Sequence, residues 1–385
     1  MLELEPRTIA CVVGARPNFV KIAPIMRAIS ARKGLVARLI HTGQHYDVAM
    51  NAVFFDELSI PSPDVNLEVG SGTGTEQTAR IMLGMESELS KKTPDLLLVV
   101  GDVNSTVASA LVAAKLRIPI AHVEAGLRSK DRSMPEEINR LVTDRLSDLL
   151  FTTEHSAVDN LIGEGVSPER IVFVGNVMID TLHACLHRAA PARETLTEIG
   201  VTPAIGEDVV SRGFALVTLH RPSNVDDRDK LALLLEALAG IAQKIPLVFP
   251  LHPRTGSMIE SADLGGFLRS SPIIVAPPLS YLRAIGLMRE ARFVVTDSGG
   301  VQEETTALGT PCLTVRNSTE RPITIEQGTN QLVATLDELN AAVDDILDNG
   351  GKKGRIPPLW DGRAAERIAE EIDAFLAHER LPLPA

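Results

Sequence analysis

The sequence predicts an α/β protein made of two successive doubly wound units. Short runs of Val, Ile and Leu alternate with longer helical patterns, and the same rhythm restarts in the second half of the chain. Uninterrupted apolar runs of this kind are typical of parallel strands that are buried on both faces. The length of 385 residues also favours two domains of ordinary size over one.

Each predicted strand is an apolar run that is followed by a helical pattern, an order that favours parallel sheets covered by helices. In the first half the strand candidates are TIACVVG, LVARLIH, DLLLVVG, IPIAHVE, DLLFTT and IVFVG, and helices are predicted over residues 20–33, 75–91 and 105–116. In the second half the strand candidates are FALVTLH, IPLVFPLH, PIIVAPP, ARFVVTD and TPCLTVR.

The break between the two units is predicted where the strand pattern lapses. A helix-like stretch over residues 179–188 is followed by AAPARETLTEIGVTPAIGEDVV, which has no strand period. A helix is predicted again over residues 364–376, after a loop rich in Gly and Pro. We therefore place an N-terminal domain at 1–179, a C-terminal domain at 180–359 and a terminal helical segment at 360–385.

Composition and charge exclude several classes of protein. The net charge of −12 argues against a nucleic-acid-binding surface, which needs a basic face. The three cysteines, Cys11, Cys185 and Cys312, are far apart, as in a reduced protein without disulfides or a structural zinc site. The N-terminus lacks the layout of a signal peptide and no apolar run is long enough to span a bilayer. We expect a soluble cytoplasmic protein with no membrane or nucleic-acid partner.

Polar side chains gather directly after the predicted strands, where ligands bind in folds of this class. The first-half strands lead into GARPNFVK, HTGQHYD, GDVNST and HVEAGLR, and the second-half strands lead into HRPSN, HPRT, DSGGVQEE and RNSTERP. We expect these groups from both halves to converge on a cleft between the two sheets.

Two of these segments open a helix and offer groups that suit an anion. In GARPNFVK, Gly14 allows a tight turn, and Arg16 and Lys21 add charge to the positive potential of a helix N-terminus. An ordinary turn with solvated basic residues fits this segment equally well, because it is neither a dinucleotide fingerprint nor a P-loop.

The segment DSGGVQEE is the stronger candidate. Gly299 and Gly300 allow a phosphate to approach the backbone, and Ser298 can donate a hydrogen bond. A glycine turn with a serine N-cap is a common alternative, but it does not explain the acids one turn later. Glu304 could accept the two hydroxyls of a ribose.

Histidines and acids complete the candidate site. His220 with Arg221 and His252 with Arg254 follow two strands, a repetition that favours anion binding over isolated structural histidines, and no metal-ligand spacing is present. Asp102 and Glu124 follow two strands of the first half, where burial and mutual repulsion would prepare them for acid/base chemistry. Glu136 heads a helix that begins at Pro135, and acids also favour a helix start for purely structural reasons.

Eight motifs in order carry a resemblance to the UDP-N-acetylglucosamine 2-epimerase family. They are GARPNFVKIAPI, TGQHYD, GDVNST, HVEAGLRS, MPEEINR, GNVMIDTL, HRPSN and DSGGVQEE with TERP. The resemblance implies two Rossmann-like domains in a GT-B-type architecture, with a cleft between them and the C-terminal helix packed back on the first domain. It also implies a homodimer.

The activity implied by the resemblance is the interconversion of UDP-GlcNAc and UDP-ManNAc without a cofactor. UDP is eliminated to give a 2-acetamidoglucal and is added back with C2 inverted. The implied catalytic residues are Asp102, Glu124, Glu136 and His220. The implied substrate-binding residues are Arg16, Lys21, Arg140, Arg221, His252, Ser298, Gly299, Gly300, Glu304 and Arg321.

The sequence departs from the family pattern at four positions. Asn18 and Ser223 stand where many members have Glu, and Tyr46 and Asp47 stand where allosterically activated members carry Arg and another polar residue. These departures count against a second, regulatory UDP-GlcNAc site, so we expect no sigmoidal substrate response. They leave open a relative that acts on a modified sugar such as a UDP-diacetamido-uronic acid.

Three other functions share these motifs. A hydrolysing 2-epimerase would release ManNAc and UDP, a glycosyltransferase of the same architecture would need an acceptor, and a nucleotide-sugar sensor would keep the pocket without catalysis. Retention of all four candidate acid/base residues argues against the sensor.

Overall fold

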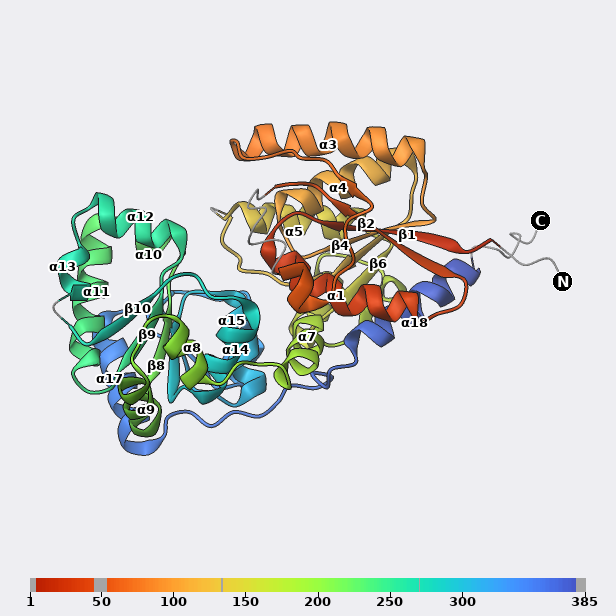
Figure 1. The fold of residues 1–385 in the computed structure, drawn as a ribbon. Helices are drawn as coiled ribbons and strands as arrows, with labels where there is room; N and C mark the ends of the chain where they lie inside the picture. The colour runs from red at the N-terminus through yellow and green to blue at the C-terminus, as the bar shows by residue number, and fades with distance from the viewer. Residues whose placement is uncertain (1–4, 45–53, 133, 270, 379–385) are drawn as a thin grey trace, which may run out of the picture. The chain divides into compact units, whose positions relative to one another are not determined.

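The computed structural model describes residues 5–44, 54–132, 134–269 and 271–378, with the side chain of Arg16 outside the description. The chain divides into two compact units. The first comprises the residues up to Ala184 together with the segment that begins at Pro358, and the second is Cys185–Pro357. Each unit holds one parallel sheet flanked by helices (Figure 1), which confirms the predicted doubly wound α/β class.

The first unit contains a seven-stranded sheet in the order β3-β2-β1-β4-β5-β6-β7. Every neighbouring pair of strands in it is parallel. Its strands are β1 (Arg7–Val13), β2 (Leu35–His41), β3 (Val65–Asn66), β4 (Leu96–Val100), β5 (Ile120–Val123), β6 (Leu149–Thr152) and β7 (Ile171–Phe173). All five residues of β4 are buried, as expected for an uninterrupted apolar run in the middle of a parallel sheet.

Those helices of the first unit that the sequence predicts start within four residues of their predicted positions, and the unit holds further helices as well. The helices of this unit are α1 (Arg16–Ser30), α3 (Gly74–Lys91), α4 (Asn104–Leu116), α5 (Pro135–Leu146), α6 (His155–Gly163), a 3-10 turn η1 (Pro168–Arg170), α7 (Val177–Leu186), which runs into the second unit, and α18 (Ala364–His378). Helix α1 begins four residues before the predicted start because Pro17 suits the first turn of a helix.

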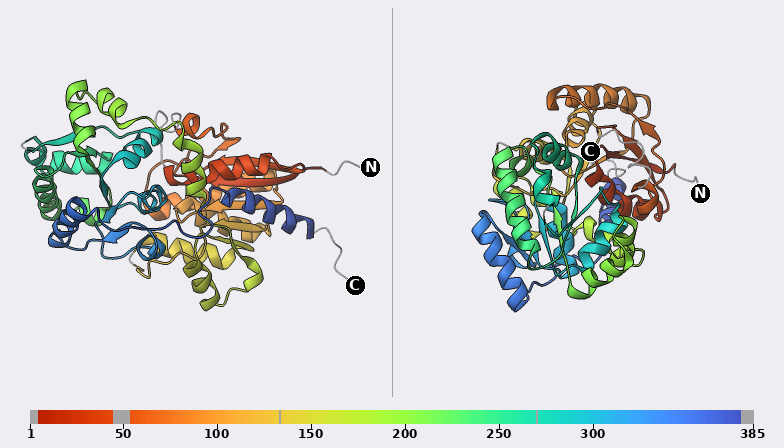
Figure 2. Two further views of the ribbon diagram at one scale, coloured as in Figure 1. Left: turned by 90° about the horizontal axis from the view of Figure 1, so that it is seen from below. Right: turned by 60° about the vertical axis from the view of Figure 1, so that its left-hand side comes forward.

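Helix α18 returns to the first unit and lies beside α1 (Figures 1 and 2). The Asp180 carboxylate accepts hydrogen bonds from the backbone N–H groups of Ala364 (3.1 Å) and Ala365 (2.7 Å). Just before the helix, the buried Trp360 indole donates to the carbonyl of Thr153 at 3.2 Å. These contacts fix the start of the helix. The predicted domain boundaries at 179/180 and 359/360 remain predictions for where independently folding domains divide.

The second unit contains a six-stranded parallel sheet in the order β10-β9-β8-β11-β12-β13. Its strands are β8 (Ala215–Thr218), β9 (Leu247–Pro250), β10 (Ile273–Ala276), β11 (Phe293–Thr296), β12 (Cys312–Thr314) and β13 (Asn330–Leu332). Its helices are α8 (Ala192–Glu198), α9 (Pro203–Arg212), α10 (Pro222–Val225), α11 (Arg228–Ala242), α12 (Pro253–Ser261), α13 (Gly265–Arg269), α14 (Tyr281–Glu290), α15 (Gly299–Leu308), α16 (Pro322–Glu326) and α17 (Leu336–Asn349).

Each unit has its own apolar core. In the first unit, Ile81, Met85 and Leu89 of α3 pack over the sheet residues Val12 and Val99. In the second, side chains of α11 and α17 close over β8, β9 and β11. Full burial of one such aliphatic side chain stabilises the fold by about 1.5–3 kcal/mol. These packed cores hold the carboxyl ends of the strands, where the predicted site residues lie, in fixed positions.

Candidate active site

The two predicted carboxylates of the first unit emerge at one edge of its sheet. Strands β4 and β5 pair with Val100 opposite Val123, so the residues that follow them leave the sheet side by side. A Cβ atom built on Gly101 would lie 3.4 Å from Oε2 of Glu124. Since Asp102 follows Gly101 directly, the strand ends bring Asp102 and Glu124 into the same region, as the sequence predicts.

Lys21 and Glu124 form an ion pair at this edge. Both side chains are almost completely buried, with exposed fractions of 8% and 5%. Glu124 has a φ of +73°, a left-handed conformation that side-chain-bearing residues rarely adopt. Such backbone strain persists only where the surroundings hold it, and it clusters at functional sites. The buried cation and the strained backbone together fix the position of this carboxylate.

Arg140 connects Asp102 to the start of α5. Its guanidinium lies 2.5 Å from Oδ2 of Asp102 and 2.7 Å from Oε2 of Glu137. Burial disfavours the ionised form of Glu137, but hydrogen bonds from the Ser129 and Lys130 backbone and from Arg140 outweigh it and lower its pKa. Through these contacts Arg140 and Glu137 connect residues 129 and 130, which follow HVEAGLR, to Asp102.

Glu136 is placed differently from its neighbour Glu137. It is half-buried in the first turn of α5, and its side chain makes no hydrogen bond or ion pair with any described residue. Helix phase explains the difference, because Glu137 and Arg140 share a face at i and i+3. Of the two neighbouring carboxylates, Glu137 is engaged in structural contacts and Glu136 can contact a substrate.

His122 and Asp144 form a buried hydrogen-bonded pair, and neither residue was among the predicted site residues. Nδ1 of His122 lies 2.6 Å from Oδ1 of Asp144, and its Nε2 lies 2.8 Å from the carbonyl oxygen of Gly101. Burial opposes ionisation of Asp144, but His122 and Arg128 hold its pKa below the usual range. Asp144 also accepts from the backbone N–H of Gly126 at 3.1 Å. This network supports the backbone on both sides of Glu124.

Asn18, one of the departures from the family pattern, is the third residue of α1, and its side chain reaches back to the backbone at the helix N-cap, Ala15. Its Oδ1 accepts the backbone N–H groups of Gly14 and Ala15, both at 3.1 Å, and its Nδ2 donates to the carbonyl of Val100 at 3.0 Å. The side chain is buried and all three contacts are to backbone. The side chain of Arg16 and the residues Tyr46 and Asp47 lie outside the described part of the chain.

In the second unit, Asp297 organises the end of two adjacent strands. Thr218 of β8 pairs with Thr296 of β11, which brings His220 next to Asp297. The fully buried Asp297 carboxylate accepts from the backbone N–H groups of His220 (3.1 Å) and Arg221 (2.9 Å) and lies 3.0 Å from Nδ1 of His220. Burial favours the neutral acid, but these donors and Asn224 lower the pKa of Asp297.

The N-terminus of α15 lies against a cluster of arginines. A Cβ atom on Gly299 would approach Oε1 of Glu320 to 2.8 Å, so a larger residue does not fit there without a shift. Glu320 in turn pairs with three arginines: Arg316 at 2.8 Å, Arg221 at 3.3 Å and Arg321 at 3.9 Å.

This cluster holds more positive than negative charge, because three arginines face the two carboxylates of Glu320 and Glu303. Burial disfavours ionisation of Glu320, but Arg321, Arg316 and Arg221 hold its pKa far below the usual range, so it is a carboxylate. Glu303 neutralises a second positive charge through an ion pair of 2.7 Å with Arg321. The remaining guanidinium charge and the N–H groups at the start of α15 suit an anion. Arg316, which sequence reasoning did not select, belongs to this cluster.

Glu304 presents a buried acceptor on the same helix. Burial raises its pKa to about 7, a hydrogen bond from Tyr281 opposes that shift, and the neighbouring Glu303 adds to it. Its Oε1 is buried and has no hydrogen-bond partner among the described residues. An unsatisfied buried acceptor is costly, so this oxygen is suited to a ligand hydroxyl.

His252 lies near His220 but is exposed. Their ring centroids are 5.3 Å apart. Nδ1 of His252 accepts the backbone N–H of Arg254 at 3.3 Å and caps α12, while the Arg254 side chain turns to Asp226 on the surface. The two His-Arg strand ends therefore meet through their histidines, through Arg254 with Asp226, and through the hydrogen bond from the Thr255 hydroxyl to the carbonyl of Leu219.

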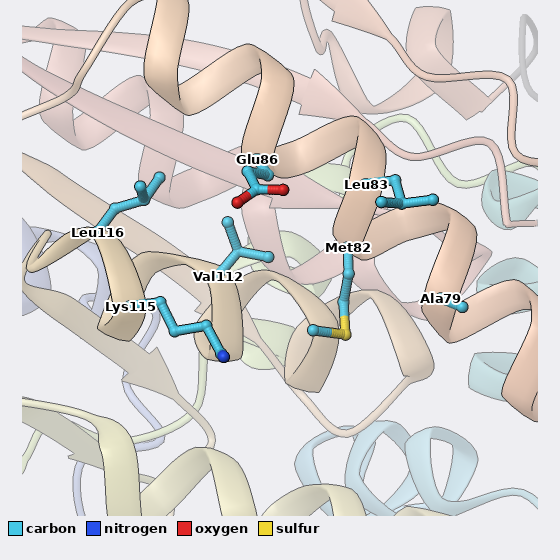
Figure 3. Close-up of a pocket in the computed structure, with 7 residues that line it drawn as sticks. All are labelled: Ala79, Met82, Leu83, Glu86, Val112, Lys115 and Leu116. Atoms are coloured by element: carbon cyan, nitrogen blue, oxygen red, sulfur yellow. The ribbon is translucent and has the colours of Figure 1, made fainter.

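The described part of the chain also has an apolar pocket of about 360 Å³ between α3 and α4 (Figure 3). It is lined by Ala79, Met82, Leu83, Glu86, Val112, Lys115 and Leu116, none of which is a predicted site residue. No described helix is long and apolar enough to cross a membrane, and the described His, Cys, Asp and Glu side chains form no group of three or more that could hold a metal ion.

Comparison with known proteins tests the resemblance that the motifs suggested. The family model described as UDP-N-acetylglucosamine 2-epimerase matches residues 27–373. A UDP-N-acetylglucosamine 2-epimerase of Methanocaldococcus jannaschii is 40% identical over 94% of this chain and 97% of its own length. A UDP-2,3-diacetamido-2,3-dideoxy-D-glucuronate 2-epimerase of Pseudomonas aeruginosa is 40% identical over 94% of this chain and 99% of its own.

A solved structure gives the same result for the fold. The crystal structure of the Methanocaldococcus jannaschii UDP-GlcNAc 2-epimerase in complex with UDP-GlcNAc and UDP has a TM-score of 0.85, with 38% identity, over 95% of this chain and 99% of that chain. The family match and these similarities cover nearly the whole chain and confirm the family predicted from the motifs. The chain belongs to the UDP-N-acetylglucosamine 2-epimerase family.

Proposed function

We propose that this protein interconverts UDP-GlcNAc and UDP-ManNAc. The observation that carries the proposal is the division of charge at the strand ends. Carboxylates paired with cations follow β4 and β5 in the first unit, and an arginine cluster meets the N-terminus of α15 in the second. The first set suits proton transfer at the sugar and the second suits a diphosphate.

The reaction needs both kinds of group because the C2 proton is not adjacent to a carbonyl. Cleavage of the C1–O bond leaves its electron pair on the UDP oxygen and builds positive charge at C1, which acidifies the C2 proton. A carboxylate takes that proton and 2-acetamidoglucal forms. Re-addition of UDP to C1 with protonation of C2 on the other face gives the epimer. Retention of glycal and UDP in one site makes the return step effectively intramolecular.

The proposed roles follow this division. Asp102, Glu124 and Glu136 act in proton transfer, and His220 acts at the leaving diphosphate. Arg221, Ser298, Gly299, Gly300 and Arg321 hold the diphosphate, and Glu304 accepts the ribose hydroxyls. The donors around the departing oxygen lower the barrier by stabilising charge that develops only as the bond breaks. Arg16, Lys21, Arg140 and His252 complete the proposed site.

A time course followed by ¹H and ³¹P NMR tests the proposal. Incubation with UDP-GlcNAc should yield a stable mixture with UDP-ManNAc, while free UDP stays at the level of the enzyme. Steady accumulation of UDP and ManNAc would identify a hydrolysing enzyme instead. No change in the UDP-GlcNAc signals would leave a glycosyltransferase or a sensor, and UDP release only on addition of an acceptor would separate those two.

A second substrate is favoured by one specific similarity. The Pseudomonas aeruginosa relative, whose name gives UDP-2,3-diacetamido-2,3-dideoxy-D-glucuronate as substrate, matches this chain at the same 40% identity as the Methanocaldococcus jannaschii enzyme. We propose UDP-GlcNAc as the preferred substrate and test it by kcat/KM for the two sugars. A higher kcat/KM for the diacetamido-glucuronate would reverse the assignment.

We also propose that the protein is a homodimer. The family resemblance implies it, and the face of α3 and α4 shown in Figure 3 supports it. Leu83 on this face is 68% exposed, and Glu86 and Lys115 give the pocket opposite charges, which allows a face to complement a second copy of itself. Leu83→Glu should convert dimers to monomers in light scattering, whereas Leu233→Glu, 54% exposed in the second unit, should not. A monomeric wild-type protein would refute the proposal.

We propose the cytoplasm as the place of action. The three cysteines are buried and free, which is the usual state of thiols in a reducing compartment. Recovery of the protein in the periplasmic or extracellular fraction of its source cells would contradict this.

A further inference from the structure

Two imidazole–carboxylate pairs lie at strand ends of this protein, one in each unit, and they differ in what the histidine can still do. In the first unit both ring nitrogens of His122 are engaged and the side chain is fully buried. In the second unit Nδ1 of His220 lies 3.0 Å from Oδ1 of Asp297, and the His220 side chain is 37% exposed. No described residue hydrogen-bonds the Nε2 of His220.

Asp297 can only accept hydrogen bonds in its present surroundings. The donors within reach are the backbone N–H groups of His220 and Arg221 and the amide of Asn224, in addition to the ring of His220. The lowered pKa of Asp297 agrees with a permanent carboxylate. A carboxylate facing Nδ1 requires a proton on that nitrogen, which leaves Nε2 as the variable position of the ring.

The partners of this pair place that Nε2 beside the proposed diphosphate site. Ser298 and Gly299, which open α15, follow Asp297 directly, and Arg221 follows His220. Arg221 donates from Nε to the carbonyl of Asp297 at 3.3 Å and pairs with Glu320 at 3.3 Å, so His220 is tied to the arginine cluster.

We propose that Asp297 is a positioning residue that fixes His220 with its proton on Nδ1 and presents Nε2 to the departing diphosphate. This inference rests on the proposed function and adds to it a residue that sequence reasoning did not select. When the C1–O bond breaks, the electron pair stays on the diphosphate oxygen, and the ring, which in this step carries a proton on each nitrogen opposite the Asp297 carboxylate, donates a hydrogen bond to that oxygen from Nε2. On re-addition that bond is released as the oxygen bonds to C1. Asp297 takes no proton in either direction.

The wild-type protein gives the first test, which needs no mutation. Histidine labelled with ¹⁵N reports which ring nitrogen carries the proton, and His220 is identified among the nine histidines by the signals lost in His220→Gln. In its neutral state His220 should carry the proton on Nδ1, and saturation with UDP should shift its Nε2 resonance. A neutral ring protonated on Nε2, or an Nε2 resonance that UDP leaves unchanged, would overturn the inference.

Asp297→Asn gives the second test. An amide NH₂ facing Nδ1 excludes a proton from that nitrogen, so the ring can no longer carry protons on both nitrogens and present its charge to the departing diphosphate through Nε2–H; kcat should fall about 100-fold or more while the Kd for UDP stays within about threefold. Asp344→Asn is the matched control, because it makes the same change in an exposed pair with Lys244 in the same unit. A folded Asp297→Asn enzyme with the wild-type tautomer would overturn the inference, whatever its rate.

The two tests also separate this inference from the proposed function. A wild-type protein that leaves UDP-GlcNAc unchanged would refute the proposed function, and the tautomer of His220 would still decide the role of Asp297. If Asp297→Asn does not fold, the wild-type spectra alone decide it.

Discussion

The two units of this protein share one architecture and differ in the residues placed just after their strands. In the first unit, a carboxylate comes after each of two adjacent strands and pairs with a buried cation, Glu124 with Lys21 and Asp102 with Arg140. In the second, a fully buried carboxylate holds a half-exposed histidine, and three arginines surround Glu320 at a helix N-terminus.

The comparison shows how one fold supports two kinds of chemistry. The sheets and their cores provide rigid edges in both units, and under the proposed function the residues at those edges decide whether a unit transfers protons or binds an anion. Changes to the carboxylates of the first unit should therefore reduce turnover with little effect on UDP binding, and changes to the arginine cluster or Glu304 of the second should alter UDP binding itself. Four sets of variants test the two units through turnover, stability or UDP affinity, in decreasing order of the change that each should cause.

Asp102→Asn should have the largest effect. It removes a proposed acid/base group without changing size, so kcat should fall by about 10²- to 10⁴-fold while the Kd for UDP changes less than about threefold. Steady-state kinetics and calorimetric titration with UDP measure the two. Asp159→Asn, on the exposed face of α6, is the matched control and should be silent. Unchanged turnover in Asp102→Asn would remove Asp102 from the mechanism.

Lys21→Met should destabilise the first unit. It removes the Lys21 partner of the buried Glu124 carboxylate, and loss of one partner of a buried ion pair costs about 3–5 kcal/mol. Trp360, the only tryptophan of the chain, lies in the first unit, so its fluorescence during urea unfolding reports on that unit. Lys21→Met combined with Glu124→Gln should recover most of the loss.

Lys244→Met, in an exposed pair of the second unit, should leave the Trp360 transition unchanged. A loss below about 1 kcal/mol in Lys21→Met would mean that the pair behaves like a surface pair.

UDP affinity should depend on pH through Glu304 in the second unit. Its pKa of about 7 means that it is mostly ionised above that pH and protonated below it. Because the proposed role of Glu304 requires the ionised form to accept both ribose hydroxyls, affinity for UDP should fall about tenfold from pH 8 to pH 6. Glu304→Gln should lose this component and keep only the titration of the UDP phosphate. Identical pH profiles for both proteins would show that Glu304 does not titrate in this range.

Asp180→Ala should have the smallest effect and should alter neither turnover nor UDP binding directly. It removes the acceptor for the first backbone N–H groups of α18, so the first unit should lose about 1 kcal/mol of stability in the Trp360 transition. Asp337→Ala, in the first turn of α17, is the matched control in the second unit. A loss as large as that of Lys21→Met would mean that α18 contributes more than its cap.

The apolar runs made most of the fold predictable from sequence, and the polar residues that follow them made much of the candidate site predictable. Apolar runs mark the buried strands, and Asp102 and Glu124 stand where two such runs end, so their approach at one edge follows from parallel pairing. Strands β3 and β13 were missed because they have only two and three residues and both include exposed positions. The segment without a strand period after residue 188 forms helices α8 and α9.

Side-chain partners could not be predicted, because they depend on packing between distant segments. His122 pairs with Asp144 across 22 positions and His220 with Asp297 across 77. A signal existed for both, since a histidine inside an apolar strand and an aspartate directly after one both need a buried partner. The choice of Glu137 over Glu136 as the buried carboxylate depends on helix phase, which the motif alone does not give.

Incubation with UDP-GlcNAc in deuterated water is the sharpest test of the proposed chemistry. If carboxylates of the first unit remove and replace the C2 proton while UDP departs and returns, NMR should show deuterium at C2 of the UDP-ManNAc formed, with C1 still bonded to UDP. Formation of UDP-ManNAc that retains the original proton at C2, in full and at every time point, would contradict proton transfer through these carboxylates.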